Sequence, residues 1–376
     1  MTLNYTRRTT ILKIWIVSII FQNKYAFAAS VVNSSYLSFI SLRWYNTKNM
    51  KRKIISLCFF GLISVCIVHA SARNEIKDLT IYAIKGPTGV GMIRLFEEPP
   101  EIQGFNVKLE AFPSPDLIAA RFISGEAMAG ILPVNMAAKI ASSGRDIRAA
   151  AVTGTGMLNL LSSDPNVKSI EDLKGKTVEV SSGQGATPDF VFRRILNFHG
   201  LNPDRDLVLG YSLSYPELAQ SLISGRSSIA LLPEPFATMA LKGRPDLKQV
   251  VDIQEEWVKT GGAGGSAASR NYPMTVLVFD GAFASANPAV AGEILDAVKK
   301  SIEWVTAHPE EAGVLVEKHG FGLKAPVVAA SVPRSNFVFI PAVDARSSIE
   351  ALLTLFLEYS PVSIGNALPQ DKFYYR

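Results

Sequence analysis

Four loops of the sequence combine small and polar residues in a pattern suited to binding a small molecule. They span 85–89, 133–135, 182–187 and 233–236, and each lies between an expected strand and an expected helix. In parallel α/β sheets, ligands bind at the carboxyl ends of strands, where free N–H groups of the following helix favour an anionic or strongly polar group. Four glycines would let a ligand approach the backbone closely: Gly86, Gly89, Gly183 and Gly185. Any one such loop is typical of an ordinary turn, but four in two related pairs favour a site.

A few side chains in these loops could set the ligand's chemistry. Glu234 lies between two prolines that fix its backbone, so its carboxylate could pair with a ligand amine or cation, although a solvated loop acid explains it equally well. The amides of Asn135 and Gln184 could hydrogen-bond a ligand of either polarity. Three aromatic residues could stack on a ring, although a core or surface role also explains each: Phe236, Tyr215 and Trp257.

Patterns typical of catalysis are sparse. Three histidines lie beyond residue 72, and His199, His308 and His319 are too far apart in the sequence for a recognisable metal site. We find no Gly-x-Ser-x-Gly elbow and no phosphate-loop lysine pattern. The sequence therefore predicts no catalytic residue, no bound metal and no cofactor.

An internal repeat supplies the elements that would position the loops. Ile123-Ser124-Gly125, followed by Leu132-Pro133, recurs one hundred positions later as Ile223-Ser224-Gly225, followed by Leu232-Pro233. Each half reads as strand, glycine loop, helix, strand, helix and a strand ending in Leu-Pro. The alternative is chance similarity between two ordinary α/β segments. A repeated α/β unit predicts two lobes, and clefts between domains are common ligand sites.

The order of elements predicts an α/β fold in which the chain leaves one lobe and later returns to it. We expect lobe one at 73–162 and 276–376 and lobe two at 163–275, joined by crossings near 158–162 and 274–279. Two crossings make a hinge. Locally, we expect Asn135 to cap a helix over 136–143 and Thr187 to cap the next one, with Pro188 and Asp189 in its first turn. A run of glycines at 261–265 predicts a flexible loop.

The charge of the chain is divided unequally. Residues 1–72 hold nine Lys or Arg and no Asp or Glu, so the formal net charge of +5 becomes −4 for residues 73–376. A nucleic-acid surface would need clustered basic residues, and we see no such cluster beyond residue 72.

The basic stretch is typical of an export signal. Lys51, Arg52 and Lys53 precede an apolar run over 54–68, and Ala70-Ser71-Ala72 fits a signal-peptidase site, so we expect a signal peptide at 50–72. An uncleaved anchor or a lipid anchor at Cys66 are alternatives. Residues 1–49 are expected to be an artefactual or disordered leader, with Met50 as the true start. Both cysteines, Cys58 and Cys66, lie in the expected signal peptide, so the mature chain would have no disulfide.

The segment 169–180, with Asp172-Leu173-Lys174-Gly175-Lys176, resembles the opening of lobe two in the extracytoplasmic solute-binding proteins of ABC importers, which have the type II periplasmic-binding-protein fold. The similarity is to the nitrate, sulfonate and thiamine-precursor group, and it covers about 76–376. It implies ligand contacts from the loops above, namely Lys85, Gly86, Thr88, Asn135, Ser182, Gly183, Gln184, Thr187, Glu234 and Phe236. An enzymatic branch of the group uses a cysteine cluster and a histidine, so the absence of cysteine from the mature chain disfavours that activity.

The resemblance implies a periplasmic or extracytoplasmic monomer that captures a small organic or anionic solute and delivers it to an ABC permease and its ATPase. Two alternatives remain open. One is a cleft enzyme acting on a small metabolite, with an acid such as Glu234 as its catalytic group. The other is a sensor subunit that presents its ligand to a signalling protein.

Overall fold

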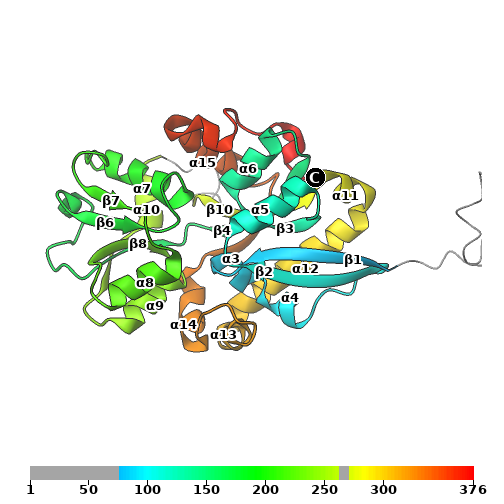
Figure 1. The fold of residues 1–376 in the computed structure, drawn as a ribbon, viewed down its shortest axis with the longest axis horizontal. Coiled ribbons are helices and arrows are strands. Elements are labelled where there is room, and N and C mark those ends of the chain that lie inside the picture. The colour runs from blue at the N-terminus through cyan, green and yellow to red at the C-terminus, as the bar shows by residue number, and fades with distance from the viewer. Residues whose placement is uncertain (1–75, 262–270) are drawn as a thin grey trace, which may run out of the picture. The chain divides into compact units, whose positions relative to one another are not determined.

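The computed structural model describes residues 76–261 and 271–376, which belong to one compact unit, Asn74–Arg376 (Figure 1). The expected leader 1–49, the signal peptide 50–72, the lipid-anchor candidate Cys66 and most of the glycine run 261–265 lie outside the described residues. Among the helices that the structure does describe, none is both long enough and apolar enough to cross a bilayer.

A six-stranded sheet forms one half of this unit. Its strand order is β11-β4-β10-β3-β1-β2. The strands are β1 (Lys77–Ile84), β2 (Phe105–Phe112), β3 (Ala129–Pro133), β4 (Ile147–Thr155), β10 (Pro273–Asp280) and β11 (Phe337–Pro341). Strands β2, β1 and β3 are parallel, whereas β10 pairs with both β3 and β4 in antiparallel fashion.

A five-stranded sheet, shown in green at the left of Figure 1, forms the other half, with the order β7-β6-β8-β5-β9. The strands are β5 (Leu158–Ser162), β6 (Thr177–Val180), β7 (Val208–Gly210), β8 (Ile229–Pro233) and β9 (Lys248–Asp252). Strands β7, β6 and β8 are parallel, and β5 runs antiparallel to β8. The expected lobe boundary at 162 left β5 with lobe one, whereas β5 pairs within the second sheet.

The predicted repeat is present in the structure. The order β2-β1-β3-β10 in the first sheet matches β7-β6-β8-β5 in the second. The repeated glycines Gly125 and Gly225 both have positive φ, at 84° and 75°. Each half also has an arginine that binds the end of the helix before this glycine. Arg145 donates to the carbonyl of Phe122 at 2.9 Å, and Arg244 donates to that of Leu222 at 3.0 Å. The two arginines therefore have equivalent roles in the two halves, although they lie outside the stretches that match in the sequence.

Helices cover both sheets, which explains the continuous apolar sequences of the central strands. Every residue of β8 is buried, and four of the five in β3 are. The helices are α3 (Pro87–Gly91), α4 (Ile93–Glu97), α5 (Pro115–Ser124), α6 (Val134–Ser142), α7 (Thr187–Phe198), α8 (Tyr215–Ile223), α9 (Phe236–Gly243), α10 (Ile253–Lys259), α11 (Gly281–Ala286), α12 (Pro288–Ala307), α13 (Pro309–Lys318), α14 (Ala325–Ser331) and α15 (Arg346–Tyr359).

The C-terminal elements pack against both halves of the unit. Phe356 and Tyr359 of α15 contact Phe190 of α7, with ring centroids 4.8 and 5.2 Å apart. On another side, Val328 and Val332 share an apolar cluster with Phe236 of α9. The same cluster includes Val90 of α3, so apolar side chains join the elements of the two sheets.

Two local predictions about helix starts were wrong. Pro133 is the N-cap of α6, so Asn135 lies inside that helix rather than capping it. Ala186 is the N-cap of α7, and Thr187 is its first residue. In both cases the strand-to-helix turn is one or two residues shorter than the side-chain pattern indicated.

Candidate functional site

The loops after β6 and β8 lie side by side because the two strands are parallel neighbours. Val180 pairs with Leu231, and the N–H of Ser181 donates to the carbonyl of Leu231 at 3.3 Å. The predicted residues 182–187 and 233–236 therefore share one edge of the five-stranded sheet, as the sequence indicated.

A third loop joins this edge through Tyr215, the first residue of α8. The hydroxyls of Ser182 and Tyr215 are hydrogen-bonded, and the Tyr215 ring stacks on Phe236 with centroids 5.6 Å apart. Ser182 has a φ of 76°, a left-handed conformation that is uncommon outside glycine and that concentrates at functional sites. Phe236 is buried with its ring against that of Tyr215, and its expected contact with a ligand stays a prediction.

Two buried hydroxyls flank this loop without a hydrogen-bond partner among the described residues. Ser181 is 0% exposed and Thr187 is 4% exposed, and neither side-chain oxygen is bonded. A buried polar group left unpaired costs about 1–3 kcal/mol, so such groups usually face water or a ligand. The sequence predicted Thr187 but missed Ser181, because Ser181 continues the strand pattern and carries no separate signal.

Glu234 follows β8 and is completely buried. Its Oε1 forms an ion pair with Nε of Arg334 at 2.9 Å, and its Oε2 accepts from the N–H and the hydroxyl of Thr238 at 3.0 and 2.6 Å. Burial raises the pKa of Glu234, and the Thr238 hydrogen bonds and the Arg334 charge act against that rise. The negative charge of Glu234 is thus balanced by Arg334 of the same chain. The expected contact of Glu234 with a ligand remains a prediction.

The crossover between β4 and β5 links this edge to the first sheet. The N–H of Glu234 donates to the carbonyl of Met157 at 3.0 Å, and the Asn336 amide donates to the carbonyl of Gly156. On the other side of the crossover, a Cβ at Gly154 would lie 3.2 Å from the Thr275 hydroxyl and 3.9 Å from the Thr88 methyl. Thr88, predicted from the first half, therefore lies beside Gly154, near the end of β4 that leads into this crossover. We call this region the seam, and it consists of residues 181–187, Glu234, residues 154–157 and Thr88.

The remaining predicted residues occupy the ends of β1 and β3 and the tip of the second glycine loop. The Lys85 ammonium donates to the carbonyl of Gly320 at 3.2 Å, and Gly86 is buried beside it. Asn135 is half-buried on α6. Gly183 is half-buried with a φ of 82°, and Gln184 is exposed. No hydrogen bond in the described residues joins Lys85 or Asn135 to the loops of the second sheet.

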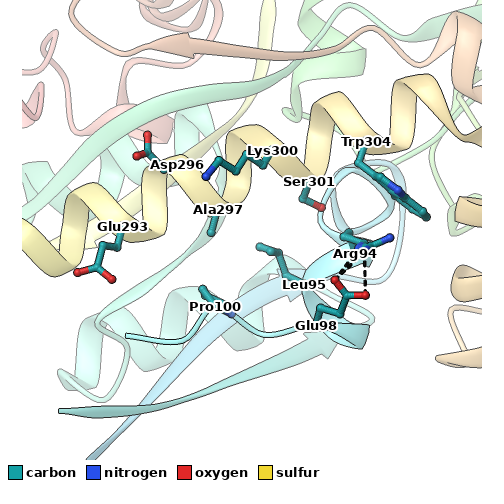
Figure 2. Close-up of a pocket in the computed structure, with 10 residues that line it drawn as sticks. All are labelled: Arg94, Leu95, Glu98, Pro100, Glu293, Asp296, Ala297, Lys300, Ser301 and Trp304. Carbon is teal, nitrogen blue, oxygen red and sulfur yellow. Dashed lines mark hydrogen bonds and ion pairs between the residues drawn. The ribbon is translucent and has the colours of Figure 1, made fainter. Parts of the chain in front are cut away.

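Two surface pockets lie away from the seam. One, of about 460 Å³, lies between α4 and α12 (Figure 2), where the Arg94 guanidinium is 4.6 Å from the Trp304 ring centroid and pairs with Glu98 at 2.6 Å. The other, of about 410 Å³, lies between α7 and α15 and is lined by Arg194, Asn197, Phe198, Thr260, Glu358 and Tyr359. Neither is lined by a predicted site residue, so the candidate site rests on the convergence of the loops.

The seam offers hydroxyls, backbone N–H groups and one internally paired carboxylate. In the part of the chain that the structure describes, no group of three or more His, Cys, Asp or Glu is arranged to hold a metal ion. The unpartnered hydroxyls of Ser181 and Thr187 are groups that can hydrogen-bond a small polar solute.

Comparisons with solved structures identify the fold. The chain is similar to an ABC transporter protein from Parabacteroides distasonis, at 24% identity, covering 80% of this chain and 99% of that one with a TM-score of 0.67. It is also similar to the periplasmic aliphatic sulphonate binding protein SsuA from Escherichia coli, at 16% identity, 80% and 99% coverage and a TM-score of 0.59. The periplasmic nitrate-binding protein NrtA from Synechocystis PCC 6803 matches at 13% identity, 77% and 84% coverage and a TM-score of 0.55. The two sheets are thus the two lobes of a periplasmic-binding-protein fold, as predicted.

No curated protein matches the sequence. The family model described as NMT1/THI5 like matches residues 101–312, which is more than half of the chain and includes most of the repeat and most of the seam. This chain therefore belongs to the NMT1/THI5-like family.

Proposed function

We propose that this protein is the substrate-binding subunit of an ABC importer and that it captures a small organic or anionic solute at the seam between its lobes. The observation that carries the proposal is the pair of buried hydroxyls, Ser181 and Thr187, that lack a partner beside the strained Ser182 loop. Family membership and the solute-binding proteins that share the fold support it.

In the proposed mechanism the solute binds between the lobes, and the lobes close about the two crossings. A ligand shifts such an equilibrium only by its difference in affinity for the two states. The closed form is then the one that a membrane permease recognises. This places the protein outside the cytoplasm, in keeping with the signal peptide expected at 50–72.

The solute class follows from Glu234 at the seam and from Lys85, a ligand contact that the family resemblance implies. Because Glu234 is already paired with Arg334, it adds no free negative charge, whereas Lys85 is a cation at the end of β1. We therefore expect an anionic or neutral polar solute in preference to a cation. Ethanesulfonate and nitrate are suitable first probes, since two of the similar proteins named above bind sulphonate and nitrate. A hydroxymethylpyrimidine is the third, because the sequence also resembles the thiamine-precursor group.

A thermal-shift screen of the exported protein with these probes tests the proposal. A solute at about one hundred times its Kd should add about 2.7 kcal/mol to the free energy of unfolding. Recovery of the bound compound unchanged supports a receptor and argues against the enzyme alternative. Absence of a shift with these probes and with amino acids, other oxyanions and flavins would count against solute binding.

A further inference from the structure

A buried carboxylate lies directly behind the second glycine loop. Asp189, in the first turn of α7, has a side chain that is 0% exposed, and its Oδ2 accepts from the N–H of Gly185 at 2.7 Å. Gly185 is the last glycine of the loop 182–187. Asp189 is therefore bonded to the backbone of the loop that carries the unpartnered hydroxyls.

The other oxygen of this carboxylate is fixed by two partners. Oδ1 of Asp189 accepts from Nε of Arg193 at 2.7 Å and from the hydroxyl of Tyr211 at 2.6 Å. Arg193 in turn donates to Asp204 at 2.7 Å and to Tyr211 at 3.1 Å. Burial disfavours the charged form of Arg193, but its hydrogen bonds to Asp204, Asp189 and Tyr211 outweigh burial and raise its pKa. The cation that orients Asp189 is thus present at every physiological pH.

The loop needs such an anchor because its own residues restrain it poorly. Ser182, Gly183 and Gly185 have φ values of 76°, 82° and 82°, and glycines populate many backbone conformations. A Cβ added at Gly183 would meet nothing within 4 Å, and one at Gly185 would meet only the edge of Phe190 at 3.9 Å. Packing around the two glycines therefore contributes little to the loop's shape, whereas a charge-assisted hydrogen bond is strong and directional.

A role in stability alone is a weak explanation for this cluster. Burying an ion pair is often no more stabilising than burying apolar side chains of similar volume, so a buried pair is weak evidence of a contribution to stability. Asp189 is also the member of the cluster that touches the loop. Arg193 and Tyr211 bond to Asp189 and fix its orientation, whereas Asp204 bonds to Arg193 alone.

We propose that Asp189 is a positioning residue of the solute site, holding the loop 182–187 in the conformation that presents Ser181 and Thr187. This inference rests on the proposed function, because the loop meets a solute only if the seam is the binding site. Because the N–H of Gly185 already donates to Asp189, this N–H is not available to bind a solute.

Two matched variants separate positioning from stability. Asp189→Asn and Asp204→Asn each remove a carboxylate that pairs with Arg193, but only the first alters the contact with Gly185. For the probe that shifts the wild-type melting temperature, whether ethanesulfonate, nitrate or hydroxymethylpyrimidine, we expect Asp189→Asn to weaken binding by about tenfold or more, equivalent to about 1.4 kcal/mol. Asp204→Asn should bind like the wild type, since Asp204 is 76% exposed and bonds to Arg193 rather than to Asp189 or Gly185.

Amide hydrogen exchange of the solute-free protein provides a second readout. Asp189→Asn should speed exchange at Gly183 and Gly185, whereas Asp204→Asn should not. If Asp189→Asn does not fold, Tyr211→Phe removes one of the two donors that orient Asp189 and should give the same changes in milder form. Wild-type affinity and wild-type exchange in Asp189→Asn would overturn the positioning role, as would equal loss of affinity in both aspartate variants. If no probe binds the wild type, the proposed function fails, while the exchange comparison still decides whether Asp189 anchors the loop.

Discussion

The guanidinium of Arg334 and the carboxylate of Glu234 form an ion pair, with Nε and Oε1 2.9 Å apart, that joins the two halves of the molecule. Glu234 follows β8 of the five-stranded sheet, and Arg334 precedes β11 of the six-stranded sheet. The carboxylate is fully buried, whereas the Arg334 side chain is 43% exposed. The pair therefore holds a buried charge at the junction of the two lobes.

Removing the cation of this pair should be strongly destabilising. Arg334→Met leaves the Glu234 carboxylate buried without a counter-charge, and breaking a buried pair in this way costs about 3–5 kcal/mol. We expect about 3 kcal/mol, the lower end of that range, because water reaches part of Arg334. Urea unfolding of the variant measures the change.

A surface arginine gives the matched control. Arg346 pairs at 2.8 and 2.7 Å with Glu350 and Asp371, whose side chains are 31% and 73% exposed, so Arg346→Met leaves no fully buried charge unpaired and should cost much less than Arg334→Met. The double variant Glu234→Gln with Arg334→Met should regain part of the stability lost in Arg334→Met. Equal effects of the two single arginine variants would contradict the view that Glu234 needs Arg334.

The two glycines of the first loop should respond differently to alanine. A Cβ at Gly89 would lie 2.2 Å from the carbonyl oxygen of Ile84 and 2.6 Å from the Phe321 ring, whereas one at Gly86 would meet nothing within 4 Å. Gly89→Ala should therefore destabilise the protein by about 1–3 kcal/mol, the usual cost of overpacking. Gly86→Ala should change the unfolding free energy by less than about 0.5 kcal/mol. Thermal unfolding measures the stability of both variants. A wild-type stability of Gly89→Ala would contradict the expected clash and show that α3 can shift away from β1.

Protonation of His199 should stabilise the second lobe. Its Nδ1 lies 2.6 Å from Glu171 and its Nε2 lies 2.7 Å from Glu256, which also pairs with Lys259 at 2.8 Å. Burial lowers the pKa of His199, but the hydrogen bonds to Glu171 and Glu256 outweigh burial, and the pKa is raised. The folded state therefore binds this proton more tightly than the unfolded state does. The resulting stabilisation is complete below the unfolded pKa of about 6.5 and is lost as the pH rises through the raised folded value.

Urea unfolding of the wild type and of His199→Gln across this pH range tests whether the contribution of His199 to the unfolding free energy falls as the pH rises. The wild type should lose its advantage over the variant as the pH rises, and Glu171→Gln should show a weaker pH dependence than the wild type. The hydrogen bond to His199 lowers the pKa of Glu171 to about 2, so this carboxylate stays charged throughout the range. An advantage that grows with pH would contradict the assignment.

The N-terminal region predicts a processed, exported protein. We expect translation from Met50 and cleavage after Ala72, which gives a mature chain that begins at Arg73. Intact-mass measurement and N-terminal sequencing of the exported protein test both points. An N-terminus upstream of Met50 would contradict the expected start, and a lipid attached to Cys66 would contradict cleavage after Ala72.

The repeat made most of the fold predictable. Hydrophobic strands, glycine loops and a Leu-Pro ending recur in both halves, so local patterns were enough to predict the parallel parts of the two sheets. Strands β9 and β11 were not predicted. β9 begins with Lys248 and Gln249, so it lacks a clear apolar pattern. β11 (Phe337–Pro341) is a short apolar run, which periodicity alone does not distinguish from a segment of buried helix.

The candidate site was predictable only in its loops. Parallel neighbouring strands must end together, which brings residues 182–187 and 233–236 to one edge. The partners of those residues come from distant segments, as Arg334 does for Glu234, and no spacing rule links them. Asp189 was visible as an acid in the first turn of a helix, but its bond to Gly185 depends on the path of the loop.

Solute binding at the seam is the central claim, and calorimetric titration of the exported protein with ethanesulfonate, nitrate and hydroxymethylpyrimidine tests it most directly. The comparison is between the wild type and the double variant Ser181→Ala with Thr187→Val. We predict that at least one probe binds the wild type with one-to-one stoichiometry and that the double variant binds it at least about tenfold more weakly, a loss of about 1.4 kcal/mol. Wild-type affinity in the double variant would show that the solute binds elsewhere, and no binding of any probe to the wild type would contradict the proposed function.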